Sequence, residues 1–138
     1  LFNGKYAGEI IMQNSIRDAY MCALKYKGYS LNTTDRKELD IAQKLLIEQK
    51  PDVEAYFVDE VREEMVAGNA ALAVCYSGEA YYYPTPNTAV YDQLDEETKN
   101  DPLIFPSEET LEKCEVYKAL DADTTAYYSQ LWKELKTS

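Results

Sequence analysis

Residues 8–28 hold a complete strand–turn–helix unit, which constrains the fold more than any other part of the chain. The segment GEIIMQN predicts a short strand that ends at Ser15. After it, apolar residues recur at helical spacing, namely Ile16, Ala19, Tyr20, Ala23 and Leu24. Gly28 suits the left-handed residue that follows a helix. A strand that leads at once into an amphipathic helix favours an α/β fold.

Ser15 and Asp18 give the start of this helix the Ser-x-x-Asp pattern of a capping box. In such a box, each side chain accepts a hydrogen bond from a backbone N–H that the helix leaves unpaired. We therefore expect the Ser15 hydroxyl to cap the helix. Asp18 has two open roles, as the second member of the box or as a charged group that meets a ligand.

The next segments continue the alternation. A helix is expected from Thr34, whose hydroxyl can cap it, to Pro51, which cannot continue it. Its apolar face consists of Leu39, Ala42, Leu45 and Leu46. Residues 54–58 and 70–76 predict strands, the second buried on both faces, and residues 61–68 predict a short helix closed by a glycine. This order predicts an α/β lobe with a largely parallel sheet.

Strand patterns stop beyond the segment YYYPTPN, residues 81–87. Residues 87–101 predict short helical turns, residues 102–110 a proline-punctuated loop, and residues 124–136 an amphipathic helix capped by Asp123 or Thr124. The apolar stripe of that last helix consists of Tyr127, Tyr128, Leu131, Trp132 and Leu135. We interpret this stripe as core packing rather than as a ligand site.

Composition limits the class of protein. A length of 138 residues predicts one lobe, and the longest apolar run is too short to span a bilayer. The net charge of −11 disfavours nucleic acid and anionic lipid as partners. It fits either attraction of cations or a merely well-solvated surface. The acidic runs at 95–97 and 107–109 fit exposed helix starts.

Histidine is absent from the sequence, which excludes Ser-His-Asp catalysis and imidazole metal sites. No phosphate-binding loop or nucleophile elbow occurs either, so we expect no enzyme, no cofactor and no metal. Cys22, Cys75 and Cys114 have no Cys-x-x-Cys spacing and are expected to be small buried hydrophobic residues. Residues 1–6 show no signal peptide and are typical of the interior of a longer protein.

Tyrosine is abundant, with 13 residues in 138. A ring that ends in a hydroxyl can hold a cation on its face and a hydrogen-bond partner at its tip, so tyrosines near carboxylates suit amine ligands. Tyrosine also fills half-buried positions in any α/β fold. Composition leaves both interpretations open.

A resemblance to a known family is carried by five segments, which are residues 12–39, 45–80, 83–94, 100–117 and 127–136. GYSLNTTD and YPTPN are the most specific motifs within them. Together they resemble the spermidine/putrescine-binding proteins of bacterial ABC importers over nearly the whole chain. The resemblance implies a three-layer lobe of the type II periplasmic-binding-protein class, with a short, largely parallel sheet flanked by helices.

Members of that family have two lobes and hold a polyamine in the cleft between them. The chain resembles only the second lobe, and the family's long excursion to the first lobe is missing between SGEA and YYYPTPN. We therefore expect residues 1–80 and 81–138 to be two segments of a single lobe, joined at a seam near Ala80 and Tyr81. An engineered excision and a natural split gene both fit. The parent protein is expected outside the cytoplasm, in the periplasm or as a cell-surface lipoprotein.

The resemblance places ligand-binding roles on Ser15, Asp18, Tyr76, Tyr83 and Tyr117. Ser15 and Asp18 match helix-start positions where the family sets acidic residues against a ligand amine, and only Asp18 keeps the charge. Tyr76 stands where the family more often has a tryptophan against the ligand's methylene chain. Tyr83 matches a cleft-facing tyrosine aimed by the Pro-Thr-Pro turn, and Tyr117 lies near a polar site position.

The function that the resemblance implies is polyamine binding, as the second lobe of an importer's substrate-binding protein. The full-length protein would deliver spermidine or putrescine to a membrane permease. One cleft wall desolvates a ligand poorly, so the lone lobe is expected to bind weakly or not at all. The alternative is a structural or interaction module that folds without ligand and self-associates, for instance as a homodimer.

Overall fold

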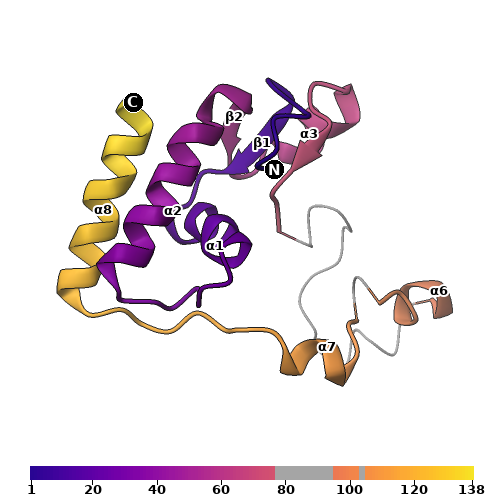
Figure 1. The fold of residues 1–138 in the computed structure, drawn as a ribbon. Coiled ribbons are helices and arrows are strands. Elements are labelled where there is room, and N and C mark those ends of the chain that lie inside the picture. The colour runs from indigo at the N-terminus through magenta and orange to yellow at the C-terminus, as the bar shows by residue number, and fades with distance from the viewer. Residues whose placement is uncertain (77–94, 103–104) are drawn as a thin grey trace. The chain divides into compact units, whose positions relative to one another are not determined.

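The computed structural model describes residues 1–76, 95–102 and 105–138 (Figure 1). They fall into a first unit, Leu1–Val74 with Val116–Ser138, and a second unit, Cys75–Glu115. In these described ranges, no helix is both long and apolar enough to cross a membrane.

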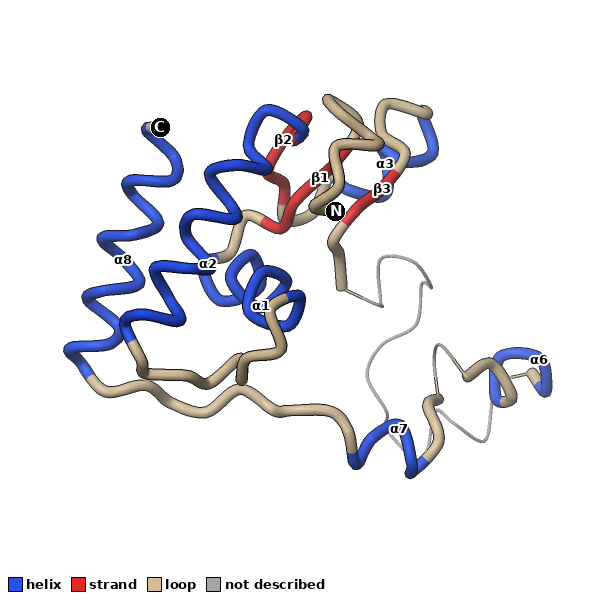
Figure 2. The backbone as a smooth tube through the Cα atoms, in the orientation of Figure 1, coloured by secondary structure: helices blue, strands red, loops and turns tan. Residues whose placement is uncertain are grey.

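A parallel three-stranded sheet forms the centre of the first unit. Its strands are β1 (Ile10–Gln13), β2 (Val53–Phe57) and β3 (Leu72–Ala73), in the order β2-β1-β3 (Figure 2). Every residue of β1 is buried, as expected for the central strand of a parallel sheet. The predicted α/β lobe with a short parallel sheet is confirmed.

The strand predicted over residues 70–76 is much shorter in the structure. β3 has two residues, both half-buried, and a further hydrogen bond joins Val74 N–H to the Ile11 carbonyl at 2.9 Å. The prediction of a strand buried on both faces is therefore wrong. β3 pairs with β1 alone in the described sheet, and an edge strand has a neighbour on one side only.

Helix α1 (Ile16–Tyr26) follows β1 directly. It buries the predicted face, which consists of Ala19, Tyr20, Ala23 and Leu24. Gly28, two residues beyond the end of the helix, is left-handed with a φ of 78°. Ser15 takes the N-cap position with extended backbone, and its carbonyl accepts from Ala19 N–H at 3.0 Å. Its hydroxyl, however, makes no capping hydrogen bond. The capping function predicted for the Ser15 side chain is wrong, and the backbone alone closes the first turn.

Helix α2 (Arg36–Gln49) begins later than predicted. Its cap is Asp35, whose carboxylate accepts from Lys37 N–H at 2.8 Å, and not Thr34. A carboxylate at this position also interacts favourably with the helix dipole, which a hydroxyl does less well. The short 3₁₀ helix η1 (Lys50–Asp52) carries the chain past the end of α2 into β2.

Helix α8 (Ala122–Thr137) begins earlier than predicted. Asp121 caps it by accepting from Thr124 N–H at 2.7 Å, so neither Asp123 nor Thr124 is the cap. The reason is again a carboxylate with the right spacing to the third residue of the helix. Figure 1 shows α8 alongside α2, with which it packs.

Three shorter helices complete the described elements: α3 (Val61–Ala67), α6 (Glu96–Lys99) and α7 (Glu108–Glu112). Gly68 ends α3 in the left-handed conformation, as predicted. The acidic runs do begin α6 and α7, and the Ser107 hydroxyl accepts from Thr110 N–H. The helical turn expected over residues 87–94 lies outside the described residues.

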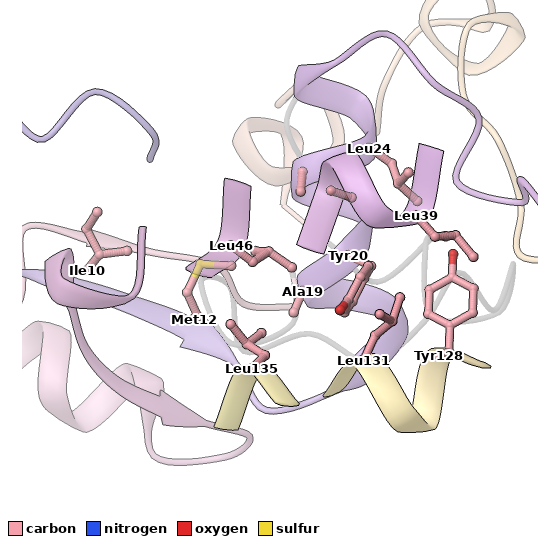
Figure 3. Close-up of a cluster of buried hydrophobic side chains, with 12 residues drawn as sticks. Ile10, Met12, Ala19, Tyr20, Leu24, Leu39, Leu46, Tyr128, Leu131 and Leu135 are labelled. Atoms are coloured by element: carbon pink, nitrogen blue, oxygen red, sulfur yellow. The ribbon is translucent and has the colours of Figure 1, made fainter. Parts of the chain in front are cut away.

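One hydrophobic core joins β1, α1, α2 and α8 (Figure 3). Its buried members are Ile10, Met12, Ala19, Tyr20, Ala23, Leu24, Leu39, Ala42, Leu46, Tyr128, Leu131 and Leu135. The stripe of α8 is thus core packing, as predicted, with Tyr127 and Trp132 half-buried at its margin. The last helix of the chain therefore completes a core that begins at residue 10.

The three cysteines are free thiols. Cys22 is half-buried, but Cys75 and Cys114 are exposed, so the prediction of small buried hydrophobic residues is wrong for these two. Cys75 follows the end of β3 and Cys114 follows the end of α7, where no regular element continues to carry the side chain into a core.

Candidate functional site

The turn between β1 and α1 lies at the carboxyl end of the central strand. The chain leaves β1 toward β2 on one side and later enters β3 on the other side. In open parallel sheets, ligands bind beyond the carboxyl ends of strands at the point where the strand order reverses. Topology alone therefore places a candidate ligand site at the start of α1.

Asp18 and Tyr117 meet at this place. The Tyr117 hydroxyl donates a hydrogen bond to Asp18 Oδ1 at 2.8 Å, although the two residues are 99 positions apart in the sequence. Asp18 is half-buried in the first turn of α1, and Tyr117 is 41% exposed in the segment that leads to α8. Two of the five predicted site residues are thus in direct contact.

The environment keeps Tyr117 protonated. Partial burial raises the pKa of its phenol, the hydrogen bond to Asp18 raises it further, and the nearby Arg17 lowers it. The net pKa lies well above the ordinary value for tyrosine. At neutral pH, Tyr117 is therefore a neutral hydrogen-bond donor to the Asp18 side chain.

Arg17 and Asn32 surround Tyr117, and the sequence analysis assigned neither of them a role. The Arg17 guanidinium carbon lies 4.7 Å from the centre of the Tyr117 ring. Asn32 bonds to the backbone on both sides of that tyrosine, at Val116 and Lys118. Asn32 lies within the GYSLNTTD motif. The specificity of that motif was the one feature of the sequence that could have indicated a role for Asn32.

The remaining predicted residues are placed less completely. Ser15 lies one turn before Asp18 at the same helix start. Tyr76 is an exposed residue of the second unit, and Tyr83 lies outside the described residues. The contact between these tyrosines and a ligand therefore stays a prediction.

Gln13 is a further polar residue at this edge of the sheet. It is the last residue of β1 and is only 1% exposed. Neither its amide oxygen nor its amide nitrogen has a hydrogen-bond partner within the described part of the chain. A buried amide without a hydrogen-bond partner destabilises the folded state, so the Gln13 side chain lowers the stability of the protein.

The chemistry of the site is that of a carboxylate with a neutral hydroxyl donor. Among the residues that the structure describes, no cluster of three or more cysteine, aspartate or glutamate side chains could hold a metal ion. A partly buried carboxylate binds an ammonium group through charge-assisted hydrogen bonds. The arrangement therefore suits an amine.

Comparison with curated proteins finds polyamine-binding relatives. The chain is 31% identical to the spermidine/putrescine-binding periplasmic protein of Escherichia coli K12 over 81 residues, which are 59% of this chain and 23% of that protein. It is 21% identical to the putrescine-binding periplasmic protein SpuD of Pseudomonas aeruginosa over 178 residues, covering 83% of this chain and 48% of SpuD. The chain thus spans about a quarter to a half of these relatives. No family model matches it.

Solved structures share the fold. The spermidine/putrescine substrate-binding protein PotD of Streptococcus pneumoniae, in complex with calcium and HEPES, superposes with a TM-score of 0.87 at 24% identity, covering 99% of this chain and 60% of PotD. A putative spermidine/putrescine ABC transporter protein of Listeria monocytogenes gives a TM-score of 0.89 at 22% identity, over 98% of this chain and 59% of that one. The resemblance and the predicted fold class are therefore confirmed. The curated relatives are named as periplasmic binding proteins for spermidine or putrescine, and the pneumococcal structure as a substrate-binding protein of an ABC transporter.

Proposed function

We propose that this chain is a polyamine-binding lobe of an ABC importer's substrate-binding protein, with spermidine or putrescine as ligand. The observation that carries the proposal is the Asp18–Tyr117 pair at the start of α1. It sets a carboxylate beside a neutral hydroxyl donor at the edge of the sheet where α/β proteins bind ligands. The names of the relatives supply the ligand class.

Each predicted site residue has a role in this proposal. Asp18 pairs with an ammonium group of the polyamine. Ser15 offers its hydroxyl to an amine, which is consistent with a side chain that makes no capping bond. Tyr76 and Tyr83 pack against the methylene chain, and Tyr117 orients the Asp18 carboxylate.

The lobe is one half of a cleft in this proposal. The alignment with SpuD runs over 178 positions and is longer than the 138-residue chain, so SpuD contains residues with no counterpart here. This supports a missing excursion to a first lobe. The seam near Ala80 and Tyr81, which lie outside the described residues, stays part of the proposal. The full-length parent would act in the periplasm or at the cell surface and hand its ligand to a membrane permease. With one wall present, ligand desolvation is incomplete, and we expect millimolar affinity at best.

The test is an NMR titration of the labelled chain with spermidine and putrescine, followed at the Asp18 amide. Saturating shifts in the millimolar range that vanish in Asp18→Asn would support the proposal. Glu63→Gln, which removes one charge from the first turn of α3, is the matched control and should titrate like the wild type. Absence of shifts at high millimolar ligand would contradict polyamine recognition by this lobe alone. Submicromolar binding would contradict the expectation that a single cleft wall binds weakly.

Self-association is a second candidate function. Val66 and Val116 are 83% and 82% exposed, which leaves apolar surface available to another copy of the chain. Sedimentation equilibrium with and without spermidine tests it. A homodimer whose dissociation constant is the same with and without spermidine would favour this candidate. A chain that stays monomeric at all protein concentrations would exclude it.

A further inference from the structure

We propose that Arg17 and Asn32 form a clamp that holds residues 116–118 against the start of α1, so that Tyr117 meets a ligand through its hydroxyl and not through the ring face that Arg17 covers. Neither residue would touch the ligand, so both are positioning residues. The statement about the ligand rests on the proposed function, whereas the clamp itself does not.

Asn32 grips the backbone on both sides of Tyr117. Its Nδ2 donates to the Val116 carbonyl at 2.9 Å, and its Oδ1 accepts from Lys118 N–H at 2.8 Å. One side-chain amide thus makes the two hydrogen bonds that a neighbouring strand would make. These hydrogen bonds hold the backbone of Val116 and Lys118, so the backbone at Tyr117 has little freedom to move. The Tyr117 side chain therefore stays near the start of α1.

Arg17 ties Asn32 to the same segment. Its Nη2 donates to Asn32 Oδ1 and to the Leu31 carbonyl, both at 3.1 Å, and its Nη1 reaches the Lys118 carbonyl at 3.4 Å. The planar guanidinium has donors fixed in a fork, so one side chain can bond to groups from different segments at once. A lysine could not reproduce this geometry.

The same guanidinium covers one face of the Tyr117 ring, with its carbon 4.7 Å from the ring centre. A cation is attracted to an aromatic ring by the negative potential of the ring face. A guanidinium that already lies over that face blocks a second cation from binding there. It would also repel that second cation. An ammonium group would therefore meet Tyr117 at its hydroxyl, beside Asp18, and not on the covered face.

The clamp can be tested without ligand through the Tyr117 phenol. We would label the tyrosines with ¹³C at Cζ, assign the Tyr117 signal from Tyr117→Phe, and raise the pH in the wild type, Arg17→Gln, Arg17→Lys and Asn32→Ala. If the clamp holds Tyr117 in place, both Arg17→Gln and Asn32→Ala release it from partial burial and from Asp18. Its pKa should then fall toward the ordinary value of roughly 10.

If Arg17 acts only as a nearby positive charge, the pKa of Tyr117 should change in the opposite direction. Removal of a positive charge alone raises the pKa of Tyr117, and Asn32→Ala leaves it unchanged, because Asn32 is neutral. Arg17→Lys keeps the charge and loses the fork, so the clamp predicts that it behaves like Arg17→Gln. A raised pKa in Arg17→Gln together with an unchanged pKa in Asn32→Ala would overturn the proposal.

Amide exchange gives a second measurement that separates release of the segment from unfolding. Lys118 N–H should exchange about fivefold or more faster in Asn32→Ala, because it loses the acceptor that protects it. Tyr29 N–H, which donates to the Leu24 carbonyl at 2.9 Å, reports on α1 and should be unchanged. Asn32→Asp keeps the acceptor and should protect Lys118 again. An unchanged Lys118 rate in a folded Asn32→Ala protein contradicts the clamp, whatever the spermidine titration shows.

Discussion

Two of the contacts that helix α1 makes with tyrosines in the C-terminal part of the chain differ in burial and in kind. Inside the core, the ring of Tyr20 packs edge-on against Tyr128 with their centres 5.2 Å apart, and the Tyr20 hydroxyl donates to Gln43 Oε1. At the surface, Asp18 accepts from Tyr117, which is 41% exposed. The first contact buries apolar surface in the core. The second orients the Asp18 carboxylate through a hydrogen bond. The same residue type therefore supplies stability in one place and a candidate site in the other.

The largest expected difference is in stability. Tyr20→Ala removes a fully buried ring and should lower the free energy of unfolding by about 3–5 kcal/mol. Tyr117→Ala removes a ring that is only partly buried and should cost less than about 1 kcal/mol, because exposed substitutions have small effects. Urea unfolding monitored by circular dichroism measures both. Equal losses would erase the distinction between the core pair and the surface pair.

Alkaline pH should lower stability through Tyr20, as one of several tyrosines whose pKa is raised in the folded state. Burial raises the pKa of Tyr20 above its unfolded value of roughly 10, so the folded state keeps a proton that the unfolded state releases. Tyr20 therefore contributes its stability fully below pH 10, and the contribution falls above pH 10 by about 1.4 kcal/mol per pH unit. Urea midpoints from pH 8 to 11 test this, with Tyr20→Phe as the control that should show a shallower decline. A flat profile for the wild type would contradict it.

The two core hydroxyls should respond differently to removal. Tyr20→Phe leaves Gln43 Oε1 without its tyrosine donor and should cost about 1–3 kcal/mol. The Tyr128 hydroxyl is buried and has no partner in the described residues, so Tyr128→Phe should be neutral or slightly stabilising. Thermal unfolding of the two variants compares them directly. A larger loss for Tyr128→Phe would show that its hydroxyl has an unseen partner.

A further expected effect is on ligand affinity. Tyr117→Phe keeps the ring and removes the donor to Asp18, and should weaken spermidine binding by about five- to tenfold with little change in stability. Tyr127→Phe on α8 is the matched control, because it removes a hydroxyl that donates to Asp40 away from the start of α1. An NMR titration measures both. Unchanged affinity in Tyr117→Phe would show that the hydroxyl does not orient Asp18 for the ligand.

Local rules predicted the elements better than their ends. The buried faces of α1 and α8 followed from helical spacing, yet the caps of α2 and α8 proved to be Asp35 and Asp121. Several neighbouring residues can cap the same helix, and small differences in backbone geometry select one of them. The prediction of a longer strand buried on both faces was wrong at β3 for another reason. An apolar run does not reveal how many strands will flank it.

The sequence by itself determined the α/β class, the buried faces of the main helices and the position of Asp18 at a helix start, because these depend on residues within one or two turns of one another. Only the tertiary structure decided that Tyr117 lies beside Asp18, and that Arg17 and Asn32 hold it there. Hydrogen bonds between residues about a hundred positions apart depend on where the chain returns. Periodicity describes a local pattern and carries no information about that return.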